Sequence, residues 1–147
     1  MRLAVTSVMM TALCAIMAAG AHGQAVDPVA QIYALVPAPA RPYGNPMGYC
    51  GRQTAGCDER LAAEVGQAMG ENVACGAPDA RVDPLQTQTA ELVRRLAIPE
   101  ERKRETAAAI RRVSAEAFRD MEGRRALDTC VEAFRRLVRL EAQLGLR

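Results

Sequence analysis

Apolar residues recur at helical spacing through most of the chain beyond residue 57. The first stretch repeats every fourth residue, which places its apolar side chains on one face of a helix. Asp58 precedes the stretch as a capping residue, and Gly76 and Pro78 follow it as stop signals. The pattern therefore predicts a helix of about four turns between Cys57 and Cys75. Its apolar face comprises Leu61, Val65, Met69 and Val73.

A second helix is predicted to start at Asp83 and Pro84, because a capping residue is followed there by proline at the first helical position. Pro99 ends this helix and opens the next helical stretch. The apolar face of the second helix comprises Leu85, Leu92, Val93 and Leu96.

From Pro99 to Leu144 the apolar spacing stays helical, and Gly123 is the only candidate break. Average helix lengths favour two antiparallel helices that meet at Gly123. One long helix is the alternative, because the apolar stripe keeps roughly heptad phase across the glycine. No segment has a strand pattern, so the sequence predicts an all-α fold: a small three- or four-helix bundle.

The first 25 residues have the order of an export signal. Arg2 is followed by an uncharged stretch from Leu3 to Ala19, and small residues come next. We expect a cleavable secretory signal peptide over residues 1–25, with Ala25 as its favoured last residue. The alternative is an uncleaved membrane anchor, for which the uncharged stretch is short.

Residues 26–49 are rich in proline and glycine, for which we expect an extended leader rather than a long helix or a central strand. A short apolar patch inside this leader can dock on the helical domain or on a partner. The patch residues considered for partner docking are Ile32, Tyr33, Leu35 and Val36. A disulfide-stapled helical domain is expected over residues 50–147.

Cleavage of the signal removes Cys14 and leaves an even number of cysteines in an oxidising compartment, which predicts two disulfides. A pair between Cys57 and Cys75 is excluded, because the helix separates them by about 27 Å and a disulfide needs roughly 4.4–6.8 Å between α-carbons. Two connectivities remain. The first joins Cys50 to Cys57 and Cys75 to Cys130, and the second joins Cys50 to Cys75 and Cys57 to Cys130. We favour the first, because only a short loop flanked by glycine lies between Cys50 and Cys57.

The charge pattern argues against two classes of partner. The net charge is +2, from 19 basic and 17 acidic residues, and acidic residues are interleaved with the arginine doublets. No strong field is therefore available to attract nucleic acid or an anionic membrane surface. We also expect no stable membrane span after signal cleavage. The basic residues are almost all arginine and alanine is abundant, which is typical of GC-rich coding and suggests a bacterial source.

The residue types of common active sites are missing. His22 is the only histidine and falls within the expected signal, so the mature chain has none for a catalytic triad or a metal site. A serine–lysine catalytic pair would have to use Ser114 and Lys103, which are eleven residues apart in the sequence. Glu116 and Asp120 lie among arginines, as in ordinary ion pairs on a helix surface. We expect no catalytic residue, no metal site and no cofactor, and hence a protein that is not an enzyme.

These features predict a periplasmic or secreted module of the bacterial envelope that binds another envelope protein. A homodimer is compatible with the apolar stripes. The alternative is a small-ligand or lipid carrier that uses a cavity between alanine-rich helices.

Intact-mass measurement of the protein from its native envelope tests the export prediction. We expect a mature chain that starts near Val26, with a mass four hydrogens below that of the reduced form, because four cysteines remain after cleavage. A retained signal segment or free thiols would contradict the prediction.

Overall fold

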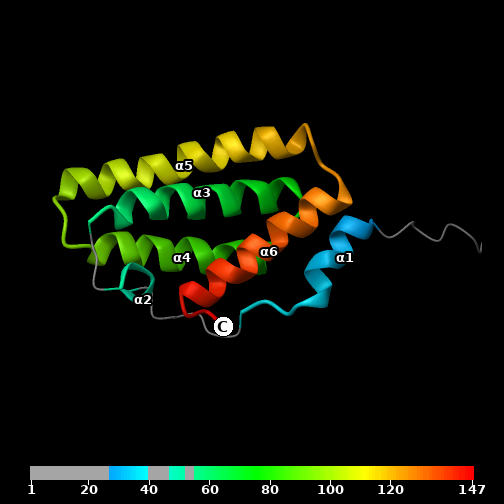
Figure 1. Cartoon of the computed structure of the whole chain (residues 1–147), viewed down its shortest axis with the longest axis horizontal. Helices are drawn as coiled ribbons and strands as arrows, with labels where there is room; N and C mark the ends of the chain where they lie inside the picture. Colours follow the sequence, from blue (N-terminus) through cyan, green and yellow to red (C-terminus); the bar gives the residue numbers. More distant parts are fainter. Residues whose placement is uncertain (1–26, 40–46, 52–54) are drawn as a thin grey trace, which may run out of the picture.

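The computed structural model describes residues 27–39, 47–51 and 55–147, and every regular element in this part is a helix. The expected signal peptide, residues 1–25, lies outside the described residues. The helices are α1 (Pro28–Leu35), α2 (Met47–Cys50), α3 (Cys57–Ala74), α4 (Asp79–Arg95), α5 (Glu100–Glu122) and α6 (Leu127–Gln143). The predicted all-α bundle is confirmed (Figure 1).

Helix α3 is the centre of the bundle, since it contacts α4, α5 and α6 (Figure 1). Two glycines on α3 let the backbone of α5 come unusually close. A Cβ built on Gly66 would lie 2.9 Å from the Ile110 carbonyl oxygen, and one built on Gly70 would lie 2.8 Å from the Phe118 nitrogen. Real Cβ atoms do not make such contacts, so only glycine fits at these two positions.

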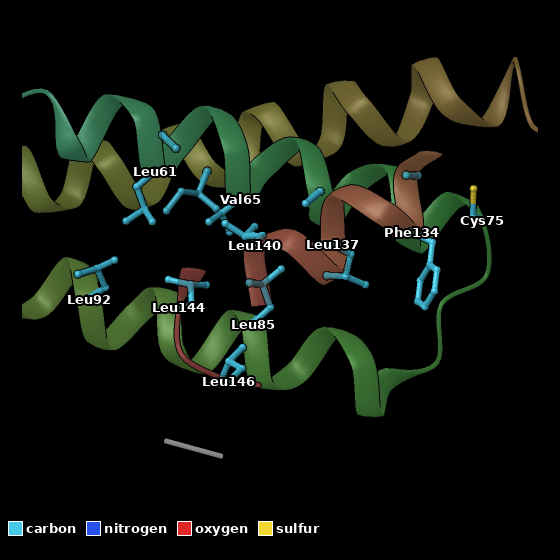
Figure 2. Close-up of a cluster of buried hydrophobic side chains, with 14 of the residues drawn as sticks. Leu61, Val65, Cys75, Leu85, Leu92, Phe134, Leu137, Leu140, Leu144 and Leu146 are labelled. Atoms are coloured by element: carbon cyan, nitrogen blue, oxygen red, sulfur yellow. The ribbon is translucent and has the colours of Figure 1, made fainter. Parts of the chain in front are cut away.

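The core lies where α3, α4 and α6 face one another (Figure 2). Leucine is the most frequent residue in it, in keeping with an aromatic content of 3%. The leucines that are nearly inaccessible to solvent are Leu61, Leu85, Leu92, Leu96, Leu137, Leu144 and Leu146. The predicted stripe on α3 enters this core through Leu61 and Val65, whereas Val73 at its end is 45% exposed.

Helix α4 begins at Asp79, one turn before the predicted start at Asp83, and Pro84 lies inside it. The prediction of this boundary was wrong. A proline this close to the N-terminal end removes one backbone hydrogen bond at most, and the turn before it buries Arg81 and Val82. Packing of that turn therefore extends the helix upstream of the proline.

Gly123 separates two helices, as favoured from the sequence, and the single long helix is excluded. Its N–H donates to the Arg119 carbonyl, 3.3 Å away, at the end of α5. At the start of α6 the Ala126 N–H donates to the Thr129 hydroxyl, at 3.0 Å, which satisfies one of the unpaired donors of the first turn.

Both disulfides have the favoured connectivity. Cys50 pairs with Cys57 at a Cα–Cα distance of 5.6 Å, and Cys75 pairs with Cys130 at 5.7 Å. The second bond joins the end of α3 to α6 across 55 positions of sequence. It holds together two core helices that the chain itself connects only through α4 and α5.

The expectation of an extended leader over residues 26–49 is corrected for residues 28–35 and 47–49, which are helical. Pro28 occupies the first turn of α1, and the Val29 N–H donates to Asp27 Oδ1 at 2.9 Å, so the helix has a regular start. The next proline is Pro37, beyond the helix end. The prolines therefore bracket α1 instead of breaking it.

Replacement of Gly70 by alanine tests the close contact between α3 and α5. We expect Gly70→Ala to lower the free energy of unfolding by about 1–3 kcal/mol or more, because the new methyl group meets the backbone of α5. Gly123→Ala is the control, since the nearest atoms to a Cβ there are 3.7 and 3.8 Å away. Urea unfolding measures both; equal stability of the two variants would contradict the close contact.

Candidate interaction surface

A groove of about 490 Å³ lies between α3 and α5, with α4 at its edge. Helix α3 forms the floor and α5 forms one wall. Gly70, which brings the two helices together, lies in the floor. The lining residues are Met69, Gly70 and Val73 of α3, Gln86 of α4, and Ile110, Arg111, Ser114, Ala115, Phe118 and Arg119 of α5.

The groove leaves several apolar side chains accessible to solvent. Val73 is 45% exposed, and only Leu35 and Leu127 are other large apolar residues exposed to a comparable degree in the described chain. Met69 and Phe118 are half-buried beside it. Ala115 is too small to cover them. An apolar strip thus stays accessible along the contact between α3 and α5.

Two arginines stand along this strip on α5. Arg111, Ala115 and Arg119 follow one another every fourth residue, so they lie on one face of the helix. Neither arginine forms an ion pair within residues 27–39, 47–51 and 55–147, although Glu116 and Glu122 are three residues from Arg119. No lining residue of the groove is acidic.

Other arginines that cross between helices are already paired. Arg102 Nε donates to Asp58 at 2.7 Å, and Arg136 donates to Glu71 at 2.9 and 3.1 Å; both carboxylates are buried. These pairs lie beside two further hollows, of about 330 and 240 Å³, whose linings mix acidic and basic residues. The groove differs from them because none of its lining residues is acidic, so its two arginines have no counter-ion within it.

The four leader residues considered for docking differ in how far the structure buries them. Ile32 and Tyr33 are buried against the bundle, Val36 is half-buried, and Leu35 is 79% exposed. The Tyr33 and Phe134 rings pack edge to face, with centroids 5.3 Å apart. None of the four lines the groove. Their role in binding a partner stays a prediction.

The Tyr33 hydroxyl joins α1 to α3. It donates to the Asn72 carbonyl oxygen at 3.2 Å and to Asn72 Oδ1 at 3.0 Å, and Asn72 Nδ2 donates to the Ala133 carbonyl of α6 at 3.0 Å. Burial raises the pKa of Tyr33. The neutral hydroxyl therefore persists as a donor.

A buried ionic cluster joins the segment after α1 to the last residue of the chain. Arg81 Nη1 donates to the Pro37 carbonyl at 2.6 Å, and its Nη2 lies 3.3 Å from Glu141. Arg147 donates to Glu141 at 2.6 Å and to the Pro37 carbonyl at 2.8 Å. Arg81 also stacks 5.2 Å from the Phe134 ring centroid. The sequence did not predict this cluster, because its members are distant in the chain and each resembles a surface residue.

Desolvation acts on both buried ions of this cluster. Burial raises the pKa of Glu141 and lowers the pKa of Arg81, and in each case the opposite charge of the other works against the shift. None of the hollows described above is lined by these residues. Arg81 and Glu141 are themselves buried, whereas Arg147 lies exposed at the edge of the cluster. We therefore assign the cluster a role in holding these segments of the chain together.

The residues considered for catalysis are not brought together. Ser114 lines the groove, whereas Lys103 Nζ donates to the Arg94 carbonyl at 3.0 Å and to Glu100 at 2.7 Å. Over the described residues, no cluster of three histidine, cysteine or acidic side chains is arranged to hold a metal ion. In the same part of the chain, no helix is both long and apolar enough to span a membrane.

Comparisons with protein-family models, curated proteins and solved structures find no match to this chain. A functional argument therefore depends on the groove and on the scaffold that carries it.

Removal of the charge on Glu141 tests the buried cluster. We expect Glu141→Gln to cost about 3–5 kcal/mol of stability, because Arg81 is left buried without a counter-ion. Glu132→Gln on the same helix is the matched control, since Glu132 pairs with Arg135 at the exposed surface. Denaturant unfolding at neutral pH measures both, and a loss no larger than that of the control would refute the structural role.

Proposed function

We propose that this chain is an exported, non-enzymatic interaction module of the bacterial envelope, and that it binds another protein through the groove between α3 and α5. The observation that carries the proposal is an open apolar strip beside two arginines that have no ion-pair partner in the described chain. Burial of that strip by a partner is favourable, and the arginines supply specificity at its edge.

The scaffold supports this role because it is rigid where the groove is built. The Cys75–Cys130 disulfide holds the end of α3, next to Val73, against α6. The close contact of Gly66 and Gly70 with α5 fixes the position of α5 against α3. A surface that is already ordered loses little conformational entropy when it binds.

Two disulfides and the absence of a candidate membrane span among the described helices are compatible with an exported protein. Periplasmic or secreted location is part of the proposal. The carrier alternative requires a cavity that encloses most of a ligand, whereas the groove is open along one side and the space between α3, α4 and α6 is filled by packed side chains, leucine foremost among them.

Cross-linking and affinity purification of the protein from its native envelope test the function. We expect a stoichiometric protein companion that is lost in Val73→Asp and kept in Leu127→Asp. The two residues are 45% and 49% exposed, so each variant places a carboxylate at a comparably exposed apolar site.

Three outcomes contradict the proposal. A bound lipid or small molecule with no protein would favour the carrier. Recovery of no companion would remove the interaction role. A companion lost equally in both variants would place the binding surface elsewhere than in the groove.

A further inference from the structure

We infer that the occupant of the groove is an amphipathic helix of a partner protein, with an apolar stripe and carboxylates about two turns apart. This inference rests on the proposed function and adds the chemistry of the partner. It follows from the length of the apolar strip, the side chains in its floor and the charges on α5.

The dimensions of the strip suit the docking of one helix. It runs along α5 from Arg111 to Arg119, which is about 12 Å, or two helical turns. Ala115 is exposed and has only a methyl group, so a partner backbone can approach α5 closely at this position. A helix presents anchors at positions i, i+3, i+4 and i+7, and this spacing matches the strip.

The apolar side chains of the strip can adjust to partner side chains of different shape. Met69, Val73 and Phe118 are partly exposed and come from two helices. Methionine has a flexible, polarisable side chain that fills irregular gaps. These residues bury apolar side chains of a partner without dictating their exact shape.

The charge along the strip specifies acidic residues on the partner. Arg111 and Arg119 are separated by two turns on one face of α5, and neither has an ion pair in the described chain. The other two hollows contain their own acids, whereas no acidic residue lines this one. Carboxylates two turns apart on a partner helix therefore face both guanidinium groups at once.

Synthetic helical peptides and charge-reversed protein test the inference. The probes are one leucine–alanine amphipathic peptide in three forms, with two Glu, two Gln or two Lys residues about two turns apart. We expect the Glu peptide to bind the full mature chain about tenfold more tightly than the Gln peptide, with an advantage that falls as salt rises.

The double variant Arg111→Glu, Arg119→Glu should reverse this preference and bind the Lys peptide best. Arg112→Glu is the matched control, because Arg112 lies on the same exposed helix but does not line the groove. Its preference should be that of the unmodified protein. Thermal unfolding checks that all three proteins are folded.

Equal binding of the Glu and Gln peptides, or a preference that survives the double variant, would overturn the inference. If binding of a native companion depends on Val73 but not on the two arginines, the proposed interaction module is supported and the acidic partner helix is refuted. Concentration-dependent dimerisation that Arg111→Glu abolishes would show that a second copy of the chain fills the groove, which also overturns the inference.

Discussion

The rest of the structure depends on the contact between the backbones of α3 and α5. Gly66 and Gly70 have no side chain there, so α5 lies against α3 at a separation that a single methyl group would prevent. With that face of α3 occupied, its other side is left for α4 and α6, and the leucine core forms between these three helices. The groove runs along the same contact, and residues of both helices line it.

Periodicity predicted the helices whose apolar faces enter the core. The apolar stripe from Leu61 to Val73 predicted the extent of α3. Pro99 and Gly123 predicted the two ends of α5, because proline and glycine change local backbone energies wherever they occur. Helical geometry also reduced the disulfide pairings to two. The start of α4 was missed because burial of Arg81 and Val82, which is a tertiary effect, outweighed the local signal at Pro84.

The groove and the ionic cluster were not visible in the sequence for related reasons. Val73 has the same spacing as Leu61 and Val65, yet it is 45% exposed, because none of the described helices covers the end of the stripe. Arg81 and Glu141 look like surface residues, but the chain after α1 and the last residue enclose them. Which faces are covered depends on how helices cross, and a single sequence records spacing along one helix at a time.

The order of the disulfides along the chain has a consequence for how the protein matures. Of the four cysteines in the described residues, the first pairs with the second, Cys50 with Cys57, and the third with the fourth, Cys75 with Cys130. For a chain that enters an oxidising compartment with its N-terminus first, an oxidase that joins cysteines in order of arrival produces the native pattern directly. Such a chain has no need of an isomerase to correct its pairing, and its second bond closes only after α4, α5 and the start of α6 have followed.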